Sequence, residues 1–200
     1  EEAIEIAGTS YSPDDIMFMQ DMVPHHNQAV QMAELVGERT NRQEINDLAG
    51  RINASQEDEI GFMLQWLRDR GEEMPDPTEH DEMQTSHMMA GMASPEQMVE
   101  LTEAEGTAFD QLFLGLMITH HEGAVTMVEE LLDQTGSAYD PVLFEFVNDV
   151  TNDQAAEIER MNALLISLSA DLRAGLASGF RDAGQVLMNL ELVTSLPKPP

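Results

Sequence analysis

Two pairs of adjacent histidines, each flanked by methionines, are the residues of this chain best suited to chemistry. The first pair is His25 and His26, with Met22 before it and Met32 after it. Imidazole nitrogen binds many transition metals, and thioether sulfur is a soft, uncharged ligand that favours Cu(I) and, by the same logic, Ag(I). Imidazole extends the choice to Cu(II), whereas Mg²⁺ and Ca²⁺ prefer oxygen ligands. The pattern predicts a site for a soft metal ion.

The same pattern recurs after a shift of 95 residues. His120 and His121 form the second pair, and Met117 and Met127 flank it as Met22 and Met32 flank the first. Single buried methionines usually fill gaps in a core, and single buried histidines usually hydrogen-bond a carboxylate. Packing alone rarely requires the same polar residues twice, so the recurrence favours metal binding in or beside the helices.

A second sequence match accompanies the first. "QEDEIGFM", which ends at Met63, aligns with "QAAEIERM", which ends at Met161, after a shift of 98 residues. Two copies of one helical hairpin therefore make up most of the chain. Two such hairpins bury their apolar stripes most simply as a four-helix bundle, and Met63 and Met161 join the candidate ligands.

Between the copies lies "GEEMPDPTEHDEMQTSHMMAGMASPEQ", residues 71–97, which has no Leu, Ile, Val, Phe, Tyr or Trp. A loop that built a core would use those residues, and exposed methionines are open to oxidation. We therefore interpret its methionines and histidines as metal ligands, with a disordered acidic linker as the alternative. The residues concerned are Met74, His80, Met83, His87, Met88, Met89 and Met92. The segment is also long enough to cross the bundle from end to end.

Start and stop signals place four long helices around these residues. They are expected at about 12–38, 42–70, 94–134, with a bend or break near Gly106, and 140–170. Since a helix turns by about 100° per residue, adjacent histidines cannot point at one spot. At most one of each pair should face the bundle axis, and the other should face a neighbouring helix or the rim.

Composition excludes several classes of function. The 38 acidic residues against nine basic ones give a net charge of −29, which repels nucleic acid and anionic membranes. That charge either concentrates cations or serves solubility and tolerance of high salt. No run of residues is apolar for long enough to insert into a membrane. The absence of cysteine removes thiolate catalysis, thiolate metal sites and disulfides, and sites of Met and His suit an oxidising space outside the cytoplasm.

Catalysis is not expected from this sequence. A di-iron carboxylate centre in a four-helix bundle would need Glu-x-x-His motifs, and none of the six histidines has Glu three residues before it. No nucleophile–base set or phosphate-binding glycine loop is present either. The chain is therefore expected not to be an enzyme.

"HHNQAVQMAEL", "GLMITHHEGAVTMVEEL" and the two Q-x-x-E-I-x-x-M segments resemble the domain of unknown function 305 family over about 10–168. The resemblance implies a ferritin-like helical bundle, and some members are extracytoplasmic copper-binding proteins linked to copper tolerance. Carried over by position, it implies the ligand set Met22, His25, His26, Met32, Met63, Met117, His120, His121, Met127 and Met161, together with the Met/His-rich linker.

The expected organisation is an all-α bundle over 10–170, with repeats at about 12–70 and 94–170 and the linker at 71–93. Residues 171–200 are expected to form a helix and a linker toward a further domain. The expected function is periplasmic or secreted sequestration or hand-over of copper, with silver or another soft transition metal as the alternative cargo. A copper-trafficking protein or the downstream domain would be the partner. A helical interaction or spacer module without metal-dependent activity remains the alternative.

Overall fold

The computed structural model describes residues 11–76 and 89–168, and helices dominate both stretches. The helices are α2 (Pro13–Glu34), α3 (Val36–Arg39), α4 (Gln43–Arg70), α5 (Pro95–Glu103), α6 (Gly106–Leu132) and α7 (Pro141–Leu168). No strand occurs in these two stretches, which confirms the all-α class. None of the helices described there combines the length and apolarity needed to cross a membrane.

The ends of the helices follow the predicted signals. Ser12 caps α2: its hydroxyl accepts a hydrogen bond from the Asp15 amide, and the Asp15 carboxylate accepts one from the Ser12 amide. Ser94 and Gln97 form the same box at the start of α5. Gly71 ends α4 in the left-handed conformation, with φ of 74°, which costs glycine little.

The expected third helix is divided in two. Ala104 and Glu105 are extended, and Gly106 has φ of 58°, so the chain leaves α5 and turns into α6. This confirms the break predicted near Gly106. The first helix also ends earlier than expected, because α2 stops at Glu34 and the short α3 follows it.

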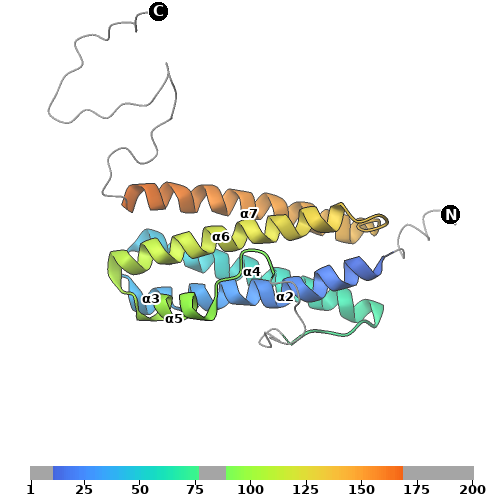
Figure 1. Ribbon diagram of the computed structural model, residues 1–200, viewed down its shortest axis with the longest axis horizontal. Coiled ribbons are helices and arrows are strands. Elements are labelled where there is room, and N and C mark those ends of the chain that lie inside the picture. Colours follow the sequence, from blue (N-terminus) through green and yellow to red (C-terminus); the bar gives the residue numbers. More distant parts are fainter. Residues whose placement is uncertain (1–10, 77–88, 169–200) are drawn as a thin grey trace, which may run out of the picture.

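The long helices form two hairpins that lie against each other. The first hairpin is α2 packed on α4, the second is α6 packed on α7, and the two meet mainly through α2 and α6. Figure 1 shows α6 and α7 running side by side, with α2 and α4 beneath them and the short α3 and α5 at one end. This arrangement is the expected four-helix bundle.

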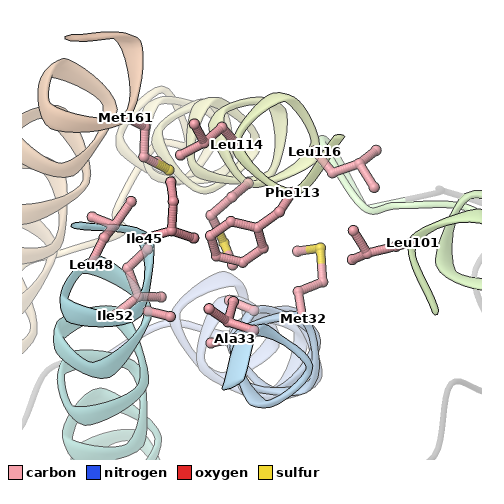
Figure 2. Close-up of a cluster of buried hydrophobic side chains, with 14 of the residues drawn as sticks. Met32, Ala33, Ile45, Leu48, Ile52, Leu101, Phe113, Leu114, Leu116 and Met161 are labelled. Carbon is pink, nitrogen blue, oxygen red and sulfur yellow. The ribbon is translucent and has the colours of Figure 1, made fainter. Parts of the chain in front are cut away.

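Two apolar clusters fill the bundle, one on each side of its middle. The first cluster contains Met32, Ile52, Met117 and Met161, and Figure 2 shows Met32 reaching from α2 toward Leu101 and Phe113 of the neighbouring helices. The second cluster, at the opposite end, contains the side chains Phe18, Met19, Met22, Val23, Met63, Trp66, Leu67, Ala124, Val128, Leu131, Leu143, Phe146, Val147 and Val150. Each long helix contributes to both clusters.

The second cluster is closed at its outer edge by an ion pair. Asp140 is fully buried, pairs with Arg70, and accepts a hydrogen bond from the Trp66 indole at 3.3 Å. The Arg70 guanidinium also lies 4.0 Å from the centroid of the Trp66 ring. The pair joins the end of α4 to the start of α7. The expected C-terminal helix and linker beyond residue 170 lie outside the described residues.

Candidate metal site

A layer of polar side chains separates the two apolar clusters. We call it the histidine layer. It consists of His25 and His26 on α2, His120 and His121 on α6, Gln56 and Glu59 on α4, and Gln154 and Glu157 on α7. All four histidines are at most 1% exposed. Buried polar groups in the middle of an apolar core are costly unless they are paired, so the layer needs a physical explanation.

The layer is where α2 and α6 cross. Along α2 the chain passes from Met22 in the second cluster through the histidines to Ala29 in the first, and along α6 it passes from Met117 in the first to Ala124 in the second. The two helices are therefore antiparallel there. His25 and His120, which correspond under the 95-residue shift, meet at the crossing with ring centroids 3.9 Å apart.

The other two histidines turn toward the partner helix of their own hairpin. His26 Nε2 lies 2.6 Å from a Glu59 carboxylate oxygen, and His121 Nε2 lies 2.6 Å from a Glu157 carboxylate oxygen. Within each pair the ring centroids are 6.2 Å and 6.1 Å apart. One histidine of each pair thus faces the opposite hairpin and one faces its own hairpin, as the angular spacing predicted. Neither lies at the rim.

The two central rings of the layer are those of His25 and His120, and Nε2 of each hydrogen-bonds a main-chain carbonyl oxygen. His25 Nε2 donates to the Ala90 carbonyl at 2.9 Å, and His120 Nε2 donates to the His25 carbonyl at 2.8 Å. A carbonyl oxygen can only accept, so the proton of each neutral ring lies on Nε2. The Nδ1 atom of each of these rings then carries a free lone pair.

All four Nδ1 atoms of the layer are buried and have no hydrogen-bond partner in the described part of the chain. The amide oxygens of Gln56 and Gln154 share this condition, as does the Gln56 amide nitrogen. Buried polar atoms in native proteins nearly always have a partner. Several lone pairs without a hydrogen-bond partner are thus gathered in one buried layer, where they could act as ligands to a metal ion.

The central rings are held in the uncharged form. Burial, and to a smaller extent repulsion from His26, lowers the pKa of His25 to about 3. Burial, followed by repulsion from His25, holds the pKa of His120 well below its usual value of 6.5. A neutral imidazole is the form that binds metal, so these rings are ready to act as ligands at neutral pH.

Carboxylates collect on one side of the layer. Asp153 on α7 has its pKa raised, first by partial burial and then by the negative charges of Glu59 and Glu157. Asp153 is therefore close enough to both glutamates for their charges to act on it. The resulting negative potential lies beside the imidazoles, where it would attract a cation and offset its charge.

The structure brings four of the predicted methionines to the two faces of the layer. Met22 and Met63 belong to the second cluster, and Met117 and Met161 belong to the first, all four fully buried. Met22 and Met117 each precede a central histidine by three residues, which puts them on the same side of their helix, one turn away. Met32 is fully buried farther along in the first cluster, about two turns beyond His25.

Met127 is only partly buried and packs against the second cluster. From the linker, Met89 and Met92 are partly buried, and Met74 is 47% exposed. The remaining candidate ligands of the linker, which are His80, Met83, His87 and Met88, lie outside the described residues.

Within residues 11–76 and 89–168, no three His, Asp or Glu side chains are gathered so that they could hold a metal ion by themselves. The other potential ligands beside the histidines are the methionines and the amides of Gln56 and Gln154. That donor set suits soft monovalent ions better than Mg²⁺ or Ca²⁺.

Some residues of the layer were not among the candidate ligands. Glu59 and Glu157 occupy equal positions in the repeated Q-x-x-E-I-x-x-M segments, so this repeat could have identified them in the sequence. The Ala90 carbonyl that binds His25 is a main-chain group and carries no signal in the sequence. Gln28, which hydrogen-bonds Ala93 through both amide atoms, was missed because its two partners are main-chain groups.

Solved structures of the same architecture have been found for other proteins. A fragment from Deinococcus radiodurans that carries domain of unknown function 305 is 29% identical and matches with a TM-score of 0.67 over 78% of this chain and 97% of its own. A Streptomyces coelicolor protein with the same domain, described as a candidate secreted protein, is 29% identical with a TM-score of 0.66 over 78% and 93%.

A third similar structure is that of a protein called CopM. Its Cu(II)-bound form is 30% identical, with a TM-score of 0.63 over 78% of this chain and 97% of its own. Its Cu(I)-bound form is 28% identical, with a TM-score of 0.59 over 75% and 94%, and a silver-bound form is also known.

A comparison with curated protein sequences gives no match. The model of one protein family, domain of unknown function 305, matches residues 15–165, which span both histidine pairs and both partner helices. The chain therefore belongs to the family of domain of unknown function 305.

Proposed function

We propose that this protein binds a soft monovalent metal ion, Cu(I) or Ag(I), in the histidine layer and sequesters it or hands it on outside the cytoplasm. The ion is the cargo of the protein. The central imidazoles of His25 and His120 would supply nitrogen through Nδ1, and the methionines that face the layer would supply sulfur.

One observation carries this proposal. In each of the four histidines Nε2 is engaged, by a main-chain carbonyl or by a carboxylate, and Nδ1 is free. Histidines that bind metals characteristically donate their other ring N–H to such a carbonyl or carboxylate, which fixes the tautomer and raises the basicity of the ligand. The layer has these supporting contacts on every ring.

The burial of the layer favours a single positive charge. An ion at this depth loses its hydration, and the cost of that loss rises steeply with charge. Cu(I) and Ag(I) pay less than divalent ions, and their preference for imidazole and thioether matches the groups at hand. Glu59 and Glu157, each hydrogen-bonded to a histidine, lie close enough to offset the added charge.

The comparisons support the same proposal. CopM has been crystallised with Cu(I), Cu(II) and silver, and it is 28–30% identical to this chain over three quarters or more of its length. The description of the Streptomyces coelicolor relative as a candidate secreted protein supports a location outside the cytoplasm. Divalent copper would be expected at more exposed positions, where a second charge costs less to hold.

The proposal is tested by titrating metal-free protein with Cu(I) or Ag(I) in competition with a chelator of known affinity. Wild-type protein should take the ion from the chelator. A variant with His25→Ala and His120→Ala should lose at least one tight equivalent. Unchanged stoichiometry and affinity in that variant would remove the histidine layer from the proposal.

An interaction module is the second candidate function. Large apolar side chains are exposed where the chain passes from α6 to α7. Tyr139 (68%) lies in the turn, and Val142 (51%) and Phe144 (51%) lie at the start of α7. Such groups often mark contact surfaces. Metal analysis of protein purified without added metal separates the two functions, because a docking module should bind its partner equally well when free of metal.

A further inference from the structure

Residues 89–93 lie unusually close to α6, and we call this segment the strap. Gly91 has φ of 78°, and a Cβ atom there would be 2.4 Å from the Thr119 carbonyl oxygen and 2.8 Å from the Gly123 Cα. A Cβ atom on Gly123 would be 2.0 Å from the Ala90 carbonyl oxygen. Only glycine at both positions allows the two main chains to approach this closely.

Hydrogen bonds tie the same strap to α2. The Gln28 amide nitrogen donates to the Ala93 carbonyl at 2.9 Å, and the Ala93 amide donates to the Gln28 side-chain oxygen at 2.7 Å. One turn earlier on α2, His25 Nε2 donates to the Ala90 carbonyl. The strap thus bridges α2 and α6 beside His25, and it is the last part of the Met/His-rich linker.

The strap makes the two central histidines inequivalent. His120 donates to the carbonyl of His25, which is part of the long helix α2. His25 donates to the carbonyl of Ala90, which belongs to a short non-helical segment that three hydrogen bonds hold to α2. Short segments with few contacts open at a lower free-energy cost than helices packed in a core. Opening of the strap would free His25 Nε2 and leave the partner of His120 in place.

We propose that Gln28 and Gly123 are positioning residues that dock the strap on His25, and that undocking of the strap sets the rate at which a soft monovalent ion enters or leaves the histidine layer. This inference rests on the proposed function. While docked, the strap covers His25 and fixes the proton on Nε2, so that Nδ1 is the ligand. When undocked, it uncovers the His25 ring and frees its Nε2.

The test compares wild-type protein with Gln28→Ala and Gly123→Ala. Gln28→Ala removes two hydrogen bonds of the strap, and Gly123→Ala places a methyl group against the Ala90 carbonyl. Gly115→Ala is the matched control, because Gly115 lies on the same helix and a Cβ atom there meets nothing within 4 Å. Gln28→Ala also serves if Gly123→Ala fails to fold.

Three measurements are made on each protein: hydrogen exchange of the Ala93 amide without metal, ¹⁵N shifts of the His25 ring, and the rate of Ag(I) uptake in stopped flow. Both test variants should show faster Ala93 exchange and a His25 ring that is no longer a single Nε2–H tautomer. Ag(I) uptake should be about tenfold faster in Gln28→Ala, as expected from losing two hydrogen bonds, and also faster than wild type in Gly123→Ala. The control should match the wild type.

The outcomes separate this inference from the proposed function. Wild-type protein that binds no Ag(I) overturns the proposed function and this inference with it. If the wild type binds Ag(I) and the test variants take it up no faster, the inference alone is overturned. It is equally overturned if Ala93 exchange is unchanged in both variants, because the strap would then be held by other contacts.

Discussion

The rings of His25 and His120 pack against each other with centroids 3.9 Å apart and planes inclined by 35°. They come from opposite hairpins and correspond to each other under the sequence shift that relates the histidine pairs. Two imidazolium cations could not occupy this position, because burial and mutual repulsion both oppose their charge. The contact therefore makes the fold itself depend on both rings staying neutral.

The first prediction concerns acid. The pKa of His25 is about 3 in the folded protein and near 6.5 in the unfolded chain. Between these values the unfolded chain binds more protons, so the stabilising contribution is present above pH 6.5 and is lost as the pH falls toward 3. We expect the unfolding free energy of metal-free protein to fall by about 1.4 kcal/mol per pH unit from this group below pH 6.

Urea unfolding at a series of pH values measures this slope, and the variant His25→Gln, which cannot be protonated, provides the comparison. The pKa of His120 is lowered as well, so the unfolding free energy of the variant should still depend on pH. Its slope should be smaller than that of the wild type. Identical slopes between pH 4 and 6 in the two proteins would show that His25 is not held neutral by the fold.

The second prediction concerns the carboxylates that support the outer histidines. Glu59→Gln keeps a hydrogen-bonding group near His26 and removes its charge. Loss of such supporting groups typically weakens metal affinity by about 10- to 100-fold, so we expect weaker Ag(I) binding in this range. A competition titration measures it, with Asp58→Asn, an exposed acid on the same helix, as control. Equal losses of Ag(I) affinity in both variants would show that the effect comes from net charge alone.

The helices and the orientation of the histidines follow from sequence patterns. Pro13 after Ser12 is a typical start of a helix, and Gly71 is a typical residue after its end. In the structure α2 begins at Pro13, and α4 ends just before Gly71. The angle of about 100° between His25 and His26 predicted that they face different neighbours. These features depend on local geometry, which a single sequence carries.

Long-range pairing did not follow from the sequence. Periodicity gives the face on which His25 lies, and it does not identify His120 as the ring that meets this face. The dependence of His25 on the Ala90 carbonyl could not be predicted either, because a main-chain group looks the same at every residue. Gly91 and Gly123 gave no signal, since their role is visible only when two distant segments lie together.

The third prediction separates the stability of the bundle from the site. Asp140 is fully buried and pairs with Arg70 at the end of the bundle farthest from the first cluster. Asp140→Ala leaves the Arg70 charge and the Trp66 N–H without this acceptor, which should cost about 3–5 kcal/mol of unfolding free energy. Thermal unfolding measures the loss. Ag(I) affinity at a temperature where the variant is folded should match the wild type, and a weaker affinity would connect this end to the histidine layer.

The fourth prediction distinguishes methionine as a ligand from methionine as core filling. Met22 and Met117 are fully buried, and leucine replaces a buried methionine at a typical cost below about 1.5 kcal/mol. If their sulfur atoms bind the ion, Met22→Leu and Met117→Leu should retain the wild-type fold and lose Ag(I) affinity, about tenfold or more when combined. Cu(I), like Ag(I), is a soft ion that favours thioether sulfur, so the affinity for Cu(I) should fall as well.

Met19 gives the matched control for this last experiment. It is as buried as Met22 and lies in the same apolar cluster, one turn earlier on α2, and it was not among the predicted ligands. Met19→Leu should therefore change the unfolding free energy by a similar amount and leave Ag(I) affinity unaltered. Chemical unfolding and competition titration on the same samples measure both quantities. If all three leucine variants bind Ag(I) like the wild type, the methionines beside the layer only fill space, and the imidazoles must hold the ion without sulfur.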